Sequence, residues 1–319
     1  MGKKAFLYAG QGSQHAGMGK NLYEQYPAFR KIYDEAKLDF DLKTLSFEDP
    51  AGQINETRFT QPVMVAFACG VTEILREMGI RPDFAAGLSL GEYSALACAE
   101  VIPPETAIEM VAFRGQEMAK ASAGVDCAMS AILGLSEDKL QEACDQAASV
   151  GPVSICNYNC PGQLVIGGAR EAVEEASGLA LAFGAKRAIP LKVSGPFHTA
   201  YMKPAGDALA SYFEKITFAE PKCRMLYNVL GGPLEEADHL MIPKLLVQQV
   251  QQPVRMEAII RWLLAEGVTE FIEIGPGKTL SGFVRKTAKD MGISDFRLIA
   301  LETVEDFRNV GLCIGQSPE

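Results

Sequence analysis

The residues with the clearest chemical potential lie at 84–93, where a short apolar run leads into a Gly-x-Ser-x-Gly pattern. Gly87 and Gly91 flank Ser89 by two residues on each side, and the chain then continues at helical spacing. Such glycines let a strand turn sharply into a helix, so that the serine oxygen lies at a helix N-terminus whose free N–H groups can stabilise an oxyanion. The pattern predicts either an acylated nucleophile or a buried glycine turn whose serine only caps the helix.

A serine needs a base to act as a nucleophile near neutral pH, and histidine is the usual one. The chain has three histidines. His15 follows a glycine turn and His239 lies in an acidic stretch, whereas His198 follows Gly-Pro-Phe at 195–197, where a turn can hold a side chain at the edge of a cleft. His198 is therefore the predicted base. No Asp or Glu between Ser89 and His198 stands out as a third member, which favours a Ser–His dyad with a backbone carbonyl to orient the imidazole.

Two further side chains could contribute to a cleft. Gln11 lies in a glycine-rich turn that does not complete the dinucleotide-binding pattern, because His15 occupies the third glycine position. The Gln11 amide either faces a ligand or is solvated, as turn glutamines commonly are. Arg114 lies in a predicted apolar helix, where it is either solvated or, if it faces a cleft, able to bind a carboxylate through two hydrogen bonds. Gly-Lys-Thr at 277–279 is not a phosphate-binding loop, since Ile272 stands at the first glycine position.

The elements that must position these residues alternate between strands and helices. Buried strands are predicted at 5–9, before Ser89 and at 270–274. Helices are predicted at 21–37, 63–78, 104–118, 204–213, 242–251 and 254–266. Residues 125–195 follow the order strand, helix, strand, strand, helix, strand, which is the ferredoxin-like signature. The predicted fold is α/β: a large α/β-hydrolase-like parallel-sheet domain, residues 1–124 and 196–319, with an inserted small ferredoxin-like (βαββαβ) subdomain, residues 125–195.

Bulk composition narrows the class of protein. The 319 residues carry 30 Lys and Arg against 40 Asp and Glu, a net charge of −10, which disfavours nucleic acid as a partner. The eight cysteines include no Cys-x-x-Cys pair, and Cys156 and Cys160 have no histidine nearby to complete a zinc site. The N-terminal apolar run is too short for a signal peptide, and no run approaches the roughly 18–20 residues of a membrane span. The sequence predicts a cytoplasmic protein without a metal site or a membrane segment.

The chain resembles the malonyl-CoA:acyl carrier protein transacylases of fatty acid synthesis along essentially its whole length. No single motif carries this resemblance; it depends on the joint occurrence of several motifs in order. These motifs lie at 10–14, 60–62, 87–95, 114–115, 157–163, 195–198, 253–255 and 275–278.

The resemblance implies that Ser89 takes the malonyl group from coenzyme A as an ester and that His198 acts as general base and acid in both half-reactions. Arg114 would form a bidentate pair with the malonyl carboxylate, and Phe197 would narrow the pocket in favour of malonyl over methylmalonyl. The resemblance also implies that the backbone N–H groups of Gln11 and Leu90 form the oxyanion hole. A backbone or amide oxygen of Gln249 would orient His198. Asn159, Gln163 and Gln61 would contact the substrate.

The resemblance thus implies transfer of malonyl from malonyl-CoA to the phosphopantetheine thiol of acyl carrier protein, with no cofactor beyond these carriers. A trans-acting malonyl acyltransferase of a polyketide synthase is an alternative that differs only in its carrier. Intact Ser89 and His198 disfavour a non-catalytic carrier-docking subunit, and Arg114 with the missing acid disfavours an esterase. One departure is Leu88, which stands where the family usually has histidine.

Overall fold

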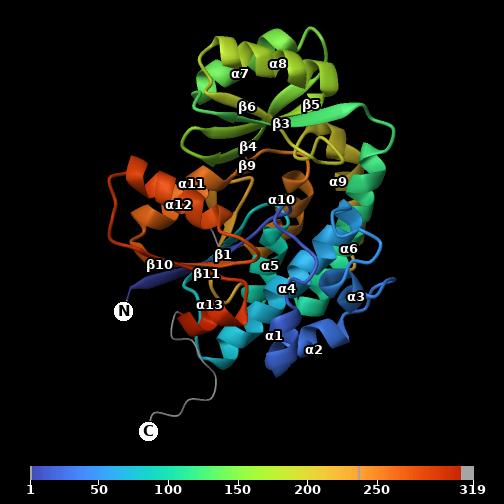
Figure 1. The fold of residues 1–319 in the computed structure, drawn as a ribbon, viewed down its shortest axis with the longest axis vertical. Helices are drawn as coiled ribbons and strands as arrows, with labels where there is room; N and C mark the ends of the chain where they lie inside the picture. Colours follow the sequence, from blue (N-terminus) through green and yellow to red (C-terminus); the bar gives the residue numbers. More distant parts are fainter. Residues whose placement is uncertain (1, 236–237, 310–319) are drawn as a thin grey trace.

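The computed structural model describes residues 2–235 and 238–309 (Figure 1). It contains a six-stranded sheet and a five-stranded sheet. In Figure 1 the smaller sheet and its helices form the upper part of the molecule, and the larger sheet with its helices lies below.

The six-stranded sheet forms the centre of the larger part. Its strands, in spatial order, are β11 (Arg297–Leu301), β10 (Val268–Ile274), β1 (Lys3–Tyr8), β2 (Phe84–Gly87), β7 (Arg224–Tyr227) and β8 (Gly232–Pro233). All neighbouring pairs are parallel except β7 with β8. Alternate residues of β1 enter two different cores: Phe6 and Tyr8 pack on one face, and Ala5 and Leu7 pack on the other. Both faces of the sheet are covered, as a parallel sheet requires.

Helices cover these two faces. One face packs against α4 (Thr57–Glu77), α5 (Gly91–Cys98) and α6 (Pro104–Ser122), and the other packs against α11 (Met256–Ala265) and α12 (Thr279–Asp290). The remaining helical segments are α1 (Lys20–Gln25), α2 (Pro27–Glu35), α3 (Leu42–Phe47), α9 (Lys203–Phe213), α10 (Ile242–Gln249), α13 (Val304–Asn309) and the 3₁₀ turns Ala200–Met202 and His239–Met241. No helix among the described residues is long and apolar enough to cross a membrane.

The five-stranded sheet has the spatial order β6 (Arg187–Pro190), β3 (Cys127–Leu133), β5 (Gln163–Ala169), β4 (Val153–Cys160) and β9 (Val254–Arg255). Strands β3 to β6 are antiparallel to their neighbours, and their order across the sheet, numbered by their order in the chain, is 4-1-3-2. Helices α7 (Glu137–Ala147) and α8 (Arg170–Ala182) cover the face turned away from the larger sheet. This is the ferredoxin-like arrangement that the order of elements predicted.

The fifth strand of this sheet comes from outside the segment 125–195. β9 pairs parallel with β4, with Asn157 opposite Val254. The smaller sheet therefore crosses the predicted boundary, and the division into two domains at 124 and 196 stays a prediction.

The predicted helix at 21–37 is wrong, because the segment forms two helices. Pro27 occupies the first position of α2, and Tyr26 before it is extended, with φ −111° and ψ 113°. A residue before proline avoids the helical region for steric reasons. The chain therefore has to leave α1 before it can enter α2.

Two other helix limits differ from those predicted. The helix expected at 63–78 begins at Thr57, so that Pro62 lies inside α4 rather than in its first turn. Residues 254–266 do not form one helix either, because the first two residues form β9 and α11 begins at Met256. In both cases tertiary packing outweighs the local signal: α4 is buried along most of its length, and β9 completes a sheet edge.

Candidate active site

Ser89 lies between the end of β2 and the start of α5, in a left-handed conformation with φ 54°. This conformation is costly for a residue with a Cβ and is found mainly where function requires it. The flanking glycines make the turn possible. A Cβ added at Gly87 would overlap the carbonyl group of Gly91, and a Cβ added at Gly91 would overlap the backbone oxygen of Tyr8. The turn has the geometry of a nucleophile elbow.

His198 lies within hydrogen-bond distance of the Ser89 hydroxyl. Ser89 Oγ and His198 Nε2 are 2.7 Å apart, and His198 Nδ1 is 2.7 Å from the backbone oxygen of Gln249. A carbonyl oxygen only accepts, so Nδ1 carries the proton and Nε2 accepts from Ser89. His198 also has a positive φ, 61°, and its N–H donates to Val250 O. The imidazole is thus oriented by a carbonyl, the arrangement that the sequence favoured.

The surroundings of His198 favour its neutral form. Burial and, to a smaller extent, the positive charge of Arg114 lower its pKa to about 4, although hydrogen bonds to the backbone of Gln249 and Gln252 act in the opposite direction. At neutral pH the imidazole is therefore unprotonated at Nε2. It is able to accept the Ser89 proton.

Arg114 projects from α6 towards Ser89 and is only 1% exposed. Its Nη1 donates to Gln61 Oε1 at 2.7 Å, and its Nη2 donates to Gln249 Oε1 at 3.0 Å and to Ser89 Oγ at 3.2 Å. Within 2–235 and 238–309 it forms no ion pair with a carboxylate. The buried Glu92 carboxyl acts on Arg114 through its charge but does not contact it. A buried cation with no carboxylate in contact is costly. The site is suited to a ligand that brings a carboxylate.

A cavity of about 190 Å³ opens beside these groups. Eight of the ten predicted site residues line it: Gln11, Gln61, Ser89, Leu90, Arg114, Asn159, Phe197 and His198. Asn159 lies on β4, and its Oδ1 is buried without a hydrogen-bond partner among the described residues. Gln249 does not line the cavity but contacts both His198 and Arg114.

The backbone N–H groups of Gln11 and Leu90 are available for an oxyanion. Both residues line the cavity, and neither N–H has a hydrogen-bond partner in the described part of the chain. The N–H of Ser89 itself is occupied, because it donates to Asn228 Oδ1 at 2.7 Å. The Gln11 side chain points to Thr57, with Nε2 3.2 Å from Oγ1.

Gln163 is not brought into this cavity. It begins β5, and its Oε1 accepts from Lys286 Nζ at 3.4 Å. Gln163 therefore does not line this cavity, and its place in the wider cleft stays a prediction. Gln163 points towards Lys286 on α12, whereas Asn159 on β4 lines the cavity that contains Ser89.

Sequence reasoning missed Asn228 and Glu92. Asn228 follows β7 and contacts both Ser89 N and Gly87 O, and its own N–H donates to Glu92 Oε2 at 2.7 Å. Glu92 had a signal, because it is the only charged residue in a short, otherwise uncharged helix. Asn228 had none, since it lies 139 residues after Ser89 in no recognisable pattern.

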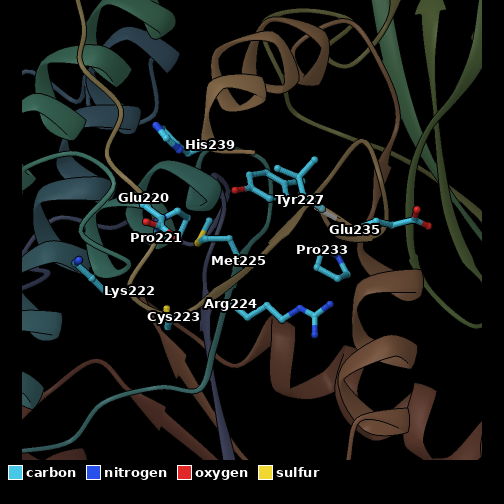
Figure 2. A pocket seen from close by; sticks show the side chains of 11 residues that line it. Glu220, Pro221, Lys222, Cys223, Arg224, Met225, Tyr227, Pro233, Glu235 and His239 are labelled. Atoms are coloured by element: carbon cyan, nitrogen blue, oxygen red, sulfur yellow. The ribbon is translucent and has the colours of Figure 1, made fainter. Parts of the chain in front are cut away.

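A second cavity, of about 390 Å³, lies at the edge of the larger sheet around β7 (Figure 2). Figure 2 shows Lys222, Arg224, Glu235 and His239 spread around it, with Cys223 on its wall. Neither Ser89 nor His198 lines it. The smaller cavity is the candidate active site, because it combines a nucleophile, a base and an unpaired cation.

The chain belongs to the acyl transferase domain family, whose model matches residues 5–312. It is 44% identical over 315 residues to the malonyl CoA-acyl carrier protein transacylase of Bacillus subtilis (strain 168), covering 96% of this chain and 98% of that protein. It is 37% identical over 311 residues to the transacylase of the same name from Staphylococcus aureus (strain MRSA252), covering 97% and 98%.

Solved structures of malonyltransferases match the chain as well. An acyl carrier protein S-malonyltransferase from Vibrio cholerae O1 biovar eltor str. N16961 matches with a TM-score of 0.90 and 39% identity, covering 97% of this chain and 99% of that one. A malonyl-transacylase solved in complex with a type II polyketide synthase acyl-carrier protein matches with a TM-score of 0.90 and 37% identity, covering 96% and 98%.

Proposed function

We propose that this protein transfers the malonyl group from malonyl-CoA to the phosphopantetheine thiol of acyl carrier protein, for fatty acid biosynthesis, through a malonyl ester of Ser89. The observation that carries the proposal is the position of Arg114, a buried cation that no carboxylate of the described residues contacts and whose Nη2 lies 3.2 Å from Ser89 Oγ. A malonyl group suits both residues, because its thioester carbonyl can react with Ser89 while its free carboxylate pairs with Arg114. Relatives that match nearly the whole chain bear the name of this reaction.

In the first half-reaction Ser89 Oγ attacks the thioester carbonyl while His198 Nε2 takes the hydroxyl proton. The carbonyl oxygen becomes an oxyanion, which accepts hydrogen bonds from the N–H groups of Gln11 and Leu90. Collapse of this intermediate breaks the carbon–sulfur bond. The leaving coenzyme A sulfur takes the proton from His198, which returns the imidazole to its neutral form.

The second half-reaction runs the same steps with a different thiol. The phosphopantetheine thiol gives its proton to His198 and attacks the ester carbonyl, and the leaving Ser89 oxygen takes that proton back. The Gln249 carbonyl holds the Nδ1 proton throughout, so that only Nε2 exchanges protons. No cofactor is needed, because the thioester is already activated.

Selectivity for malonyl follows from the desolvation of Arg114. The malonyl carboxylate replaces the neutral partners of the guanidinium with a charge-assisted pair, whereas an acetyl group leaves the cation buried and unpaired. Phe197 lines the cavity beside His198 and limits space at the malonyl α-carbon. Gln61 holds Arg114 in place, and the free Oδ1 of Asn159 faces the same cavity.

The test is covalent labelling with malonyl-CoA. Wild-type protein is expected to gain one malonyl group by intact mass, and Ser89→Ala is expected to gain none. Ser94→Ala is the matched control, because Ser94 lies on α5, is buried and does not line the cavity. Malonylation of Ser89→Ala at another residue, under conditions where the wild type is labelled, contradicts the proposal.

The identity of the carrier is a separate question. One solved relative was captured with a polyketide synthase carrier, so a trans-acting malonyl acyltransferase of a polyketide synthase is the second candidate. Rates of malonyl transfer to carriers from fatty acid and polyketide synthesis separate the two candidates. We further propose that the protein acts in the cytoplasm.

A further inference from the structure

Both backbone polar groups of Ser89 are held by amide side chains from distant parts of the chain. The Ser89 N–H donates to Asn228 Oδ1, and Gln249 Nε2 donates to the Ser89 carbonyl, each at 2.7 Å. A turn residue usually satisfies these groups with neighbouring backbone or with water. Here the N–H donates to the Asn228 side chain, and the carbonyl accepts from the Gln249 side chain in addition to the neighbouring Glu92 N–H at 3.1 Å. Both amide side chains are fully buried and have no freedom to exchange with solvent.

The Asn228 amide continues the sheet where the strands stop pairing. The parallel pairing of β2 with β7 covers only Phe84 and Ala85. Beyond it, the Asn228 side chain accepts from Ser89 N–H and donates through Nδ2 to Gly87 O at 2.6 Å. One side-chain amide thus bridges the residues on either side of Leu88, as a backbone peptide of a neighbouring strand would do.

Asn228 is itself fixed from both sides. Its N–H donates to Glu92 Oε2 at 2.7 Å, and its carbonyl accepts from Arg255 N–H at 3.0 Å. Glu92 is fully buried on α5, directly after the turn, and its Oε1 has no partner among the described residues. Burying a carboxyl group is costly unless it makes hydrogen bonds. The Asn228 N–H supplies one such bond, and the side-chain amide of Gln249 also stabilises the charged carboxylate.

The strained conformation of Ser89 explains why such a hold is needed. A left-handed φ at a residue with a Cβ persists only where the surroundings enforce it. Rotation of the Ser89 backbone towards an ordinary conformation would move Oγ away from His198 Nε2. The same hold occupies the Ser89 N–H, which leaves the N–H groups of Gln11 and Leu90 to receive the oxyanion.

We infer that Asn228, anchored by Glu92, is a positioning residue that holds the Ser89 backbone in the conformation required for attack. Asn228 acts through the nucleophile: it does not line the cavity and touches neither His198 nor Arg114. The inference rests on the proposed function, because it requires Ser89 to be the nucleophile.

The first experiment compares Asn228→Ala with the wild type. The kcat for malonyl transfer is expected to fall about 100-fold, the size of effect that a small misplacement of a reacting group produces. The KM for malonyl-CoA is expected to stay within about twofold, since Arg114 and the cavity are untouched. The rate of reaction with a fluorophosphonate, which reports the serine geometry without using Arg114, is expected to fall with kcat.

A stability control separates positioning from loss of folded protein. Leu263→Ala removes a fully buried side chain of α11, remote from the cavity, and so lowers the melting temperature without touching Ser89. It is expected to keep wild-type kcat at temperatures below its melting transition. Asn228→Ala contradicts the inference if it keeps kcat within about twofold of the wild type, or if Leu263→Ala loses kcat to the same extent.

The second experiment uses Asn228→Asp, which keeps an acceptor for Ser89 N–H but donates to Gly87 O only when protonated. Its kcat is expected to approach that of the wild type at acid pH and to fall as the carboxyl ionises, over about pH 5 to 8 for a buried carboxyl. The wild type and Glu92→Gln, which keeps an acceptor for Asn228, are expected to lack this decline. A profile of Asn228→Asp parallel to that of the wild type contradicts the inference.

The two proposals fail in different ways. If Ser89→Ala loses labelling while the Asn228 variants react like the wild type, Ser89 is the nucleophile and the positioning role is wrong. If Ser89→Ala is still labelled, the proposed function itself is wrong.

Discussion

Arg114 and His198 both contact the Ser89 hydroxyl, and the charge of the first changes the basicity of the second. The guanidinium donates to Ser89 Oγ, and its charge contributes to the low pKa of His198. A bound malonyl carboxylate neutralises that charge. The substrate then weakens one of the two effects that depress the pKa, so the base becomes stronger when the correct acyl group is in place.

The depressed pKa of His198 predicts an acid-tolerant base. Because a lowered pKa keeps the imidazole neutral as the pH falls, reaction of free Ser89 with a fluorophosphonate is expected to lose rate only as pH approaches about 4. An ordinary histidine would lose it near 6.5. Arg114→Gln removes the positive charge and is expected to move the acid limb of the pH–rate profile to higher pH. The pH dependence of inactivation measures both, and a wild-type limb near 6.5 would falsify the prediction.

At the scale of elements, the turn from β2 into α5 depends on backbone contacts that leave no room for a side chain. Gly91 approaches the backbone of Tyr8, the last residue of β1, and of Ala9 directly after it, which cannot move without distorting the central sheet. Gly178 on α8 is also helical, but a Cβ there would meet nothing within 4 Å. The two glycines therefore form a matched pair.

Gly91→Ala is expected to destabilise the protein by several kcal/mol and to abolish labelling of Ser89, because the added Cβ overlaps backbone. Gly178→Ala is expected to leave activity unchanged and to stabilise the protein by about 0.5–1 kcal/mol, since alanine favours a helix interior. Urea unfolding and malonyl labelling of the two variants test this. Equal stability of the two variants contradicts the steric argument.

The sequence predicted elements well where the signal was local. The strand before Ser89, the helix that carries Arg114 and the order of elements at 125–195 are confirmed by the structure. Prediction failed where tertiary packing decided: Pro62 lies inside a buried helix, and two residues of a presumed helix complete a sheet. Helix α12 and strand β11 were not predicted from the sequence.

The same distinction applies to the site. The pattern around Ser89 and the short list of histidines made the Ser89–His198 pair predictable from residue types. The contacts of Asn228 were not predictable, because an amide 139 residues from the serine has no local signature. Gln249 was named only through the family resemblance, and its bond to the Ser89 carbonyl was not predicted. Gln163 does not line the cavity, because it lies opposite Cys160, whose side chain faces the other way from that of Asn159.

At the scale of the whole molecule, the site contains two buried ionisable groups with opposite effects on stability. Burial raises the pKa of Glu92 to about 7 and lowers that of His198 to about 4. A raised carboxyl pKa means that the folded state binds more protons than the unfolded state between about 4.5 and 7, so stability falls as pH rises there. For His198 the unfolded state binds more protons than the folded state between about pH 4 and pH 6.5, so its contribution makes stability rise with pH there.

Glu92→Gln is expected to remove the first effect and leave the second. Relative to the wild type, the free energy of unfolding of this variant is expected to rise between pH 5 and pH 7.5 by about 2 kcal/mol, the part of the shift from 4.5 to about 7 that falls in this pH range. Urea unfolding at the two pH values measures the difference. A difference between variant and wild type that does not change with pH contradicts the linkage.

The two-residue strand β9 has a consequence for exchanging parts between relatives. It pairs with β4 through Val254, and Arg255 N–H donates to the Asn228 carbonyl at 3.0 Å. The ferredoxin-like segment is therefore connected to Asn228, which holds the Ser89 backbone, through β9, a strand that lies outside the segment. A graft of 125–195 alone would set a foreign β4 against the resident β9. A working chimera needs residues 254–255 from the same donor as the segment.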